Sequence, residues 1–138
     1  MKRLAMIALA VATAACGGSS TSPTVVSNAT VTTETFTGTV SPGGSDSHNF
    51  TVNTGGGSIN ITLIAAGPPA TITMGLGLGN PSTTGTCSII PGFGIQTTAG
   101  STAQLPASGA PAGAYCVIVA DVGNVLQPVT YTVTVAHT

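Results

Sequence analysis

The chain has 138 residues, of which 42% are apolar and only 4% are charged. This length is enough for one domain with one hydrophobic core. Lys2 and Arg3 are its only basic residues, and both precede an apolar run that has the features of a removable signal. A mature chain without Lys or Arg has no cations to neutralise phosphate groups or to form salt-bridge networks. The composition therefore argues against nucleic acids and nucleotides as ligands.

Residues 1–15 have the pattern of a bacterial signal peptide. Lys2 and Arg3 are followed by an apolar stretch, and small residues then lead into Cys16. The apolar stretch is much shorter than the roughly 20 residues that a membrane-spanning helix needs. The segment resembles the lipoprotein signals of bacteria, which implies that Cys16 becomes an acylated first residue. The alternative is a plain secreted protein with an unpaired Cys16.

Residues 16–29 are predicted to form a lipidated cysteine and a flexible linker, because Gly, Ser, Thr and Pro dominate and charge is absent. Gly17, rather than Asp, follows the cysteine. By analogy with the sorting rule of enterobacterial lipoproteins, this favours the outer membrane. The expected location is thus the bacterial cell envelope, with the domain held by a lipid anchor.

Residues 30–138 are predicted to form one all-β domain, because apolar and polar residues alternate with period two and no helical periodicity appears. Short strands without intervening helices indicate an antiparallel β-sandwich of about eight or nine strands. The expected strands are at residues 30–40, 47–53, 58–65, 71–78, 87–90, 94–98, 101–105, 113–121 and 129–137.

The last expected strand has the clearest register. Its threonines should face outward, because a hydroxyl keeps that face wet without charge. A shift by one residue would expose four large apolar side chains, so the register is well specified. The residues expected to point inward are Val129, Tyr131, Val133 and Val135.

Cysteine counting predicts a disulfide. Once Cys16 is set aside, Cys87 and Cys116 remain as an even pair, and export to an oxidising compartment favours their oxidation. The bridge would close a loop of about 30 residues, which the chain-entropy treatment values at roughly 3.6 kcal/mol. The alternative is two free buried thiols.

The chain also resembles the bacterial pre-peptidase C-terminal domain over residues 34–136. The early part of that pattern is matched by Phe36, Gly38, Val40, Asp46, Phe50 and Val52. Its closing part is matched by Gly113, Tyr115, Val117, Val119, Tyr131, Val133 and Val135. The resemblance implies a jelly-roll-like β-sandwich. It also implies a non-catalytic module, since family members are usually appendages of secreted hydrolases and some relatives bind collagen or calcium.

Few side chains offer chemistry. Asp46 and His48 share one face of an extended segment and form two of the ligands that a metal site needs, although a solvated turn at the start of a strand is the preferred interpretation. Asp121 is expected to cap a turn through its own backbone rather than to join a calcium site. Glu34 is expected to face outward, and His137 to lie free near the chain end. No catalytic residue, metal or cofactor is predicted.

Phe93 lies in a Pro-Gly-Phe-Gly segment and is a candidate for a binding loop, with core packing beneath the loop as the alternative. Gly75, Gly77 and Gly79 alternate with apolar residues, so one face of that strand is bare. Such a face permits the close approach of another backbone, or lies against solvent.

These patterns predict a lipid-anchored, non-enzymatic module that binds or scaffolds through a neutral surface at the cell envelope. The alternative is an accessory domain that binds an extracellular glycan or protein substrate through residues 80–94 and 106–112. A metal enzyme or hydrolase built on Asp46 and His48 is a third hypothesis. The expected partners are the membrane, an envelope protein or glycan, and a second copy of the chain, since few charges protect the sheet edges.

Overall fold

The structure, a computed structural model, describes residues 29–138. The predicted signal peptide, Cys16 and all but the last residue of the predicted linker lie outside the described residues. The described part contains eight strands and no helix, and no segment in it is a helix able to cross a membrane. The strands are β1 (Thr32–Val40), β2 (Ser45–Val52), β3 (Gly57–Gly67), β4 (Met74–Pro81), β5 (Cys87–Thr97), β6 (Leu105–Ala110), β7 (Gly113–Ala120) and β8 (Val129–His137).

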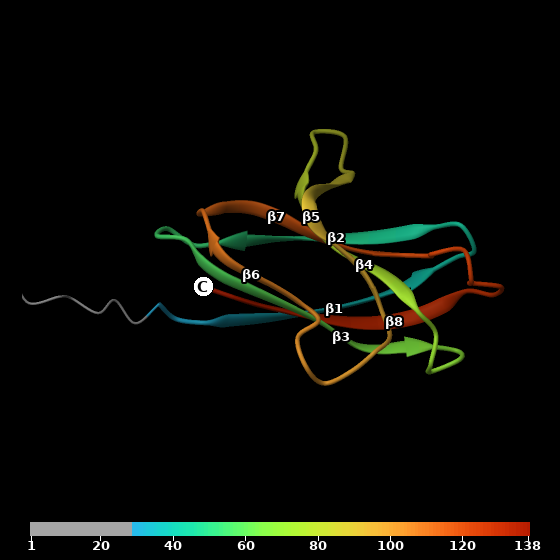
Figure 1. The fold of residues 1–138 in the computed structure, drawn as a ribbon. Helices are drawn as coiled ribbons and strands as arrows, with labels where there is room; N and C mark the ends of the chain where they lie inside the picture. The colour runs from blue at the N-terminus through green and yellow to red at the C-terminus, as the bar shows by residue number, and fades with distance from the viewer. Residues whose placement is uncertain (1–28) are drawn as a thin grey trace, which may run out of the picture.

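The strands form two four-stranded antiparallel sheets that pack face to face (Figure 1). One sheet has the order β1-β8-β3-β6 and the other has the order β2-β7-β4-β5. Strands β1 and β2 are therefore neighbouring edges on one side of the molecule, and β5 and β6 are neighbouring edges on the other side. The predicted antiparallel β-sandwich is confirmed.

The core lies between the sheets and is built from alternate residues of each strand, as the period of two requires. In β8 the predicted register is confirmed, because its inward residues are buried while Thr130, Thr132 and Thr134 are exposed or half-buried. These outward threonines lie opposite Thr39, Thr37 and Thr35 of the neighbouring strand β1.

The two strands expected at 87–90 and 94–98 are one strand, β5. Its pairing with β4 passes from Gly79 opposite Ile89 to Gly77 opposite Gly94, so residues 90–93 form an enlarged bulge. Because a bulge tolerates Pro and Gly, the Pro-Gly pair inside this segment interrupts the ladder without ending the strand.

The strand expected at 101–105 begins only at Leu105. The reason is Gln104, whose side-chain oxygen accepts a hydrogen bond of 2.7 Å from the Leu63 amide and whose Nε2 donates one of 3.2 Å to the Leu63 carbonyl. The amide side chain thus takes the place of a backbone partner for β3, and the preceding residues remain a loop.

The chain enters and leaves at the same end of the sandwich. Thr32 pairs with His137, and residues 53–56 and Thr138 lie beside them. The opposite end consists of the loops at 41–44, 67–73 and 121–128 (Figure 1). The fold therefore separates the site where the linker attaches from these three loops.

Candidate functional site

Most titratable side chains of residues 29–138 gather along the seam between the edge strands β1 and β2. The inward faces of these strands are only partly covered, and they meet the inward face of β8. The side chains are Glu34, Asp46, His48, Tyr131 and His137. They form two clusters.

The first cluster joins Asp46, His48 and Tyr131. The Tyr131 hydroxyl donates a hydrogen bond of 2.8 Å to Asp46 Oδ2, and its oxygen lies 2.8 Å from His48 Nε2. Since the single phenolic hydrogen is directed to the carboxylate, His48 Nε2 is assigned as the donor to the phenolic oxygen. His48 Nε2 and Asp46 Oδ2 are 3.8 Å apart, and the two side chains are 26% and 34% exposed.

The environment keeps Tyr131 protonated. Burial raises the pKa of its hydroxyl far above the usual range, and the hydrogen bond to Asp46 and the negative charge of that carboxylate raise it further. The hydroxyl is therefore a stable donor to Asp46 at any ordinary pH.

Strand β1, which neighbours β8 in the same sheet and faces β2 of the other sheet, supports this cluster. The ring of Phe36 stacks on the imidazole of His48, with centroids 4.8 Å apart and planes 8° from parallel. A Cβ at position 38 would stand 2.6 Å from the Tyr131 hydroxyl and would also overlap Asp46 Oδ2. Glycine at position 38 thus provides the space in which the two oxygens meet.

The second cluster corrects two expectations. His137 is 2% exposed rather than free at the chain end, because β8 pairs through its last residue with both β1 and β3. Glu34 faces the seam rather than solvent, and its Oε1 lies 2.9 Å from His137 Nε2. A carboxylate only accepts, so Nε2 carries the hydrogen, and the buried Nδ1 has no hydrogen-bond partner. Phe50 lies against the same ring, with centroids 5.3 Å apart.

The expected solvated turn at Asp46 is also wrong, because Asp46 lies within β2 and both it and His48 are half-buried, whereas the expected strand position of His48 is confirmed. Counting His, Cys, Asp and Glu alone, residues 29–138 contain no group of three that could hold a metal. The third polar group beside Asp46 and His48 is the phenol of Tyr131. The sequence pattern did not connect Tyr131 with this pair, because Tyr131 is 85 residues away from Asp46 in the chain.

Asp121 caps the turn that follows β7, so its predicted role as a turn cap is confirmed. Its Oδ1 accepts hydrogen bonds from the amides of Gly123, Asn124 and Val125, and its Oδ2 accepts one of 2.7 Å from Gly43. The bond from Gly43, together with those from its own loop, lowers the pKa of the Asp121 carboxyl below its ordinary value near 3.8. The carboxylate thus joins the β1–β2 and β7–β8 loops.

The predicted disulfide between Cys87 and Cys116 is present, with sulfurs 2.05 Å apart and Cα atoms 5.8 Å apart. It lies over the outer face of β4, since Cys87 is paired with Pro81 and Cys116 with Gly79. A Cβ at Gly79 would stand 2.9 Å from Cys87 Sγ and would also overlap the backbone of Ser88.

The bare glycine face of β4 is covered by the chain itself. A Cβ at Gly77 would stand 2.9 Å from Ile118 and 3.0 Å from Ile89. The close approach of another backbone is found at Gly79, where Ser88 is the neighbour, whereas at Gly77 the neighbours are the side chains of Ile89 and Ile118.

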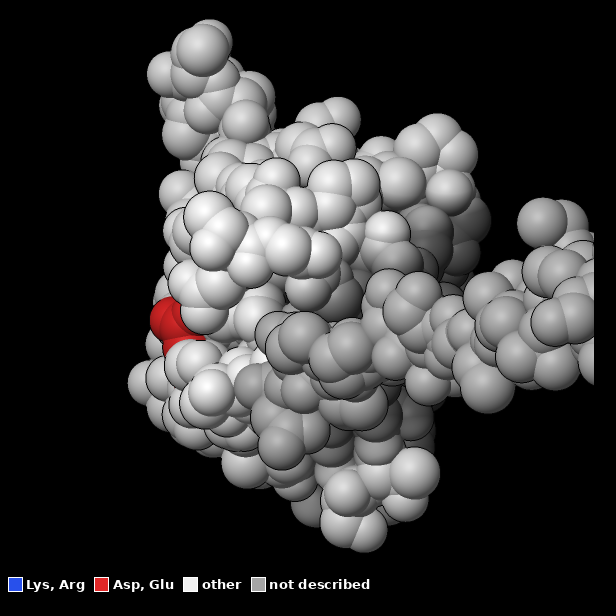
Figure 2. Space-filling model, turned by 90° about the vertical axis from the view of Figure 1, so that its left-hand side faces the viewer, with Lys and Arg blue, Asp and Glu red and all other residues white. Residues whose placement is uncertain are grey.

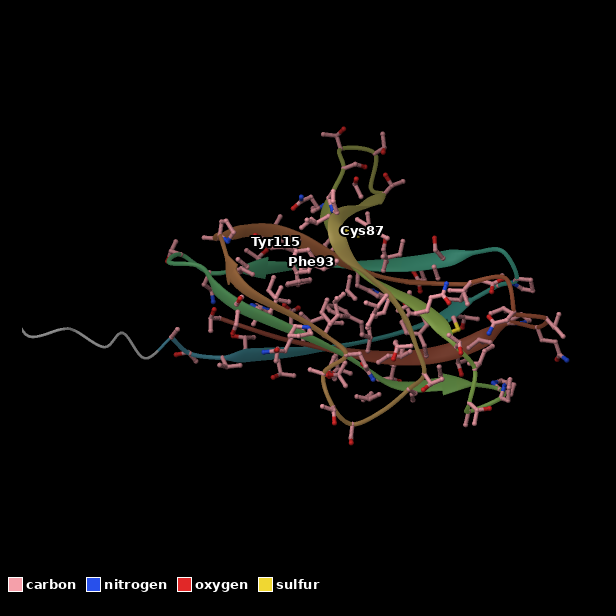
Figure 3. The ribbon with its side chains drawn as sticks, viewed as in Figure 1. Cys87, Phe93 and Tyr115 are labelled. Atoms are coloured by element: carbon pink, nitrogen blue, oxygen red, sulfur yellow. A yellow bond between two sulfur atoms is a disulfide. The ribbon has the colours of Figure 1, made fainter. Side chains whose placement is uncertain are left out.

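Phe93 is not at a loop tip. It lies in the bulge of β5, half-buried and packed against the core. With Tyr115 it lines a pocket of about 220 Å³ beside the β5–β6 edge (Figure 3). Most of the expected contact segments 80–94 and 106–112 is strand rather than loop, but both segments contribute to this pocket.

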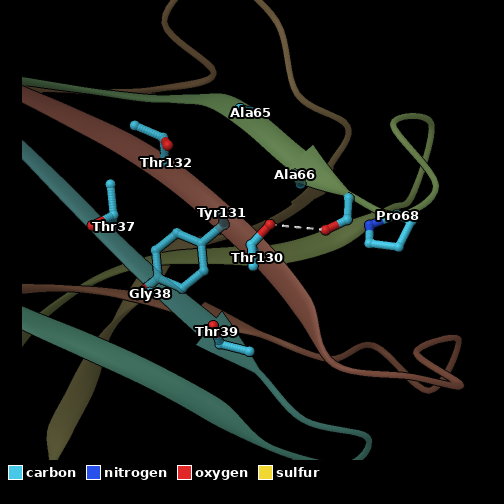
Figure 4. A pocket seen from close by; sticks show the side chains of 10 residues that line it. Thr37, Gly38, Thr39, Ala65, Ala66, Pro68, Thr130, Tyr131 and Thr132 are labelled. Atoms are coloured by element: carbon cyan, nitrogen blue, oxygen red, sulfur yellow. Dashed lines mark hydrogen bonds between the residues drawn. The ribbon is translucent and has the colours of Figure 1, made fainter.

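The outer face of the first sheet carries hydroxyl groups in place of charges. A shallow groove of about 740 Å³ crosses β1, β8 and the end of β3, and its wall includes Thr37, Thr39 and Thr132 (Figure 4). Thr130 Oγ1 donates a hydrogen bond of 3.1 Å to the Gly67 carbonyl beside the groove. Figure 2 shows the end of the sandwich where the two termini lie, and the described residues on that face include one acidic spot and no Lys or Arg.

Comparison with known protein families and with curated proteins returns no match for this chain.

Proposed function

We propose that the mature chain is a non-enzymatic binding module, attached to the bacterial outer membrane by a lipid on Cys16. The observation that carries this proposal is the separation of the two ends of the sandwich. The linker joins β1 at one end, and the loops at 41–44, 67–73 and 121–128 lie at the other (Figure 1). These loops therefore lie at the end of the domain away from its point of attachment. The resemblance to the pre-peptidase C-terminal domain supports the same kind of role.

The loop end has the features of a contact surface. Residues of two loops line an apolar groove of about 520 Å³, among them Pro68, Ile72 and Leu126. The Leu126 side chain is 90% exposed, whereas most large apolar residues of the described part are buried. No Lys or Arg is present after Arg3, so binding here depends on shape, apolar contact and backbone hydrogen bonds.

Attachment is tested by partitioning whole cells or extracts into detergent. Full-length wild-type protein should enter the detergent phase and Cys16→Ser should remain in the aqueous phase, because several acyl chains are needed for stable membrane anchoring. Ser20→Ala is the matched control and should partition like wild type. A Cys16→Ser protein that still enters the detergent phase would refute the anchor.

Binding is tested by capture from a cell-envelope extract. Wild-type protein should retain a specific protein, and Leu126→Ser should retain much less of it while keeping the same unfolding midpoint. Equal capture by both proteins would place the contact surface elsewhere.

A second candidate function is an accessory domain for a glycan or protein substrate. The pocket beside Phe93 and Tyr115 favours it, because the two segments expected to form the contact surface meet there. A glycan array separates the candidates: the accessory domain should bind a defined sugar, and Phe93→Ala should abolish that binding, whereas Leu126→Ser should leave it unchanged.

A further inference from the structure

The cluster in the seam between β1 and β2 brings three different donor atoms to one point. Asp46 Oδ2, His48 Nε2 and Tyr131 Oη form a triangle with sides of 2.8, 2.8 and 3.8 Å. From these sides, the point equidistant from the three atoms lies about 1.9 Å from each of them. A cation slightly above the plane of the triangle would therefore lie at the roughly 2.0–2.2 Å that oxygen and nitrogen ligands prefer around zinc.

The chemistry of the three groups selects a class of ion. Imidazole suits zinc and copper, whereas calcium and magnesium prefer sites made only of oxygen ligands. Residues 29–138 contain no Lys or Arg that could pair with the carboxylate of Asp46. The side chains of Asp46 and His48 are partly exposed, so an ion can enter from solvent and keep water on its open side.

We propose that Asp46, His48 and Tyr131 bind a divalent transition-metal ion of the zinc or copper class, with water completing its coordination. This site is independent of the binding role proposed above. The charge of the ion offsets the burial and the Asp46 carboxylate that otherwise keep Tyr131 protonated, so the metal takes the place of the phenolic hydrogen, which leaves as a proton. The imidazole hydrogen moves from Nε2 to Nδ1. The ion then holds together the three atoms that are otherwise joined by hydrogen bonds.

Two residues next to the triangle help to hold its three side chains in position. Phe36 stacks on the imidazole and fixes the plane of the ring. Gly38 leaves space beside the two oxygens, because any larger residue would overlap them. Such supporting groups orient metal ligands and tune their affinity.

The experiment is isothermal titration calorimetry of the full-length protein without a histidine tag. Zinc chloride is the titrant in one series and copper chloride in a second series. Wild type should bind one ion per chain. Asp46→Asn, His48→Gln and Tyr131→Phe should each weaken binding by roughly 100-fold or more, since loss of a mere outer-shell partner costs about 10- to 100-fold. Glu34→Gln is the matched control from the same seam and should bind like wild type.

The absorption of tyrosinate provides a second measurement. The chain has two tyrosines and no tryptophan, so metal binding should produce a tyrosinate difference spectrum that Tyr115→Phe retains and Tyr131→Phe lacks. Circular dichroism confirms that each variant is folded, and if Tyr131→Phe is not, the Asp46 and His48 variants still decide. Absence of one-to-one binding by wild type, or equal weakening by Glu34→Gln, would overturn the proposal.

Discussion

The hydroxyl of Tyr131, on β8 of one sheet, donates a hydrogen bond of 2.8 Å to the carboxylate of Asp46, on β2 of the other sheet. This bond crosses the interior at the side where neither sheet has a further strand. It joins a buried phenol to a half-exposed acid, so the polar seam holds the two sheets together at their β1 and β2 edges.

We predict that Tyr131→Phe destabilises the protein by about 1–3 kcal/mol, because it leaves Asp46 and His48 without their shared partner. The value should be nearer the lower limit, since both partners are partly exposed to water. Tyr115→Phe is the matched control, because it loses a single bond of 2.9 Å to the Pro111 carbonyl. Urea unfolding should rank Tyr131→Phe as the more damaging change, and the reverse order would contradict the role of the seam.

Gly79→Ala should destabilise the protein by about 1–3 kcal/mol or more, because the new methyl group overlaps the backbone of Ser88 and crowds Cys87. Gly94→Ala provides the control on the neighbouring strand. A Cβ there meets only Ile89, at an ordinary 3.6 Å, and Gly94 has no left-handed backbone. Thermal unfolding should show a lower midpoint for Gly79→Ala and an unchanged or slightly higher one for Gly94→Ala.

Removal of the disulfide by the double change Cys87→Ala and Cys116→Ala should cost roughly 3.6 kcal/mol, from the loop of 29 residues that it closes. Denaturant unfolding measures this cost. Alkylation followed by intact-mass measurement provides a direct check: neither cysteine of the non-reduced protein should react, and two reactive thiols in the folded protein would disprove the bridge.

Asp121 should make the free energy of unfolding depend on pH in the acidic range. Its carboxyl has a lower pKa in the folded chain than in the unfolded chain, so its contribution is fully present above the ordinary value near 3.8. That contribution should fall as the pH drops from 3.8 through the lower folded pKa, because the unfolded chain takes up the proton first. Asp121→Asn should therefore flatten the decrease in the unfolding midpoint below pH 4, whereas an unchanged slope would show that other groups cause it.

The chain without its anchor should associate with itself. Strands β1, β2, β5 and β6 are edges, and Lys, which commonly protects such edges, is absent from residues 29–138. Ile89, on the edge strand β5, is a large apolar residue with an exposed side chain. Sedimentation velocity should show reversible association that weakens in Ile89→Thr, and a monomer at every concentration would rule this out.

The amino-acid sequence by itself determined the features that depend on local pattern. Alternation with period two specifies strands and their inward faces, as in Val133 and Thr134 of β8, because successive side chains of a strand point to opposite sides. Cysteine pairing followed from the even number that remains after Cys16. The glycine spacing of β4 indicated a bare face, which the disulfide and β5 cover.

Only the tertiary structure decided which strands lie side by side. Glu34 and His137 are 103 residues apart, and Asp46 and Tyr131 are 85 apart, so no local signal connects either pair. The sheet order brings β1, β2 and β8 together. It thereby buries or half-buries polar side chains that the sequence pattern predicts to be exposed to solvent. Pairing of distant strands depends on the packing of the whole chain, and the polar seam therefore appears only once both sheets are assembled.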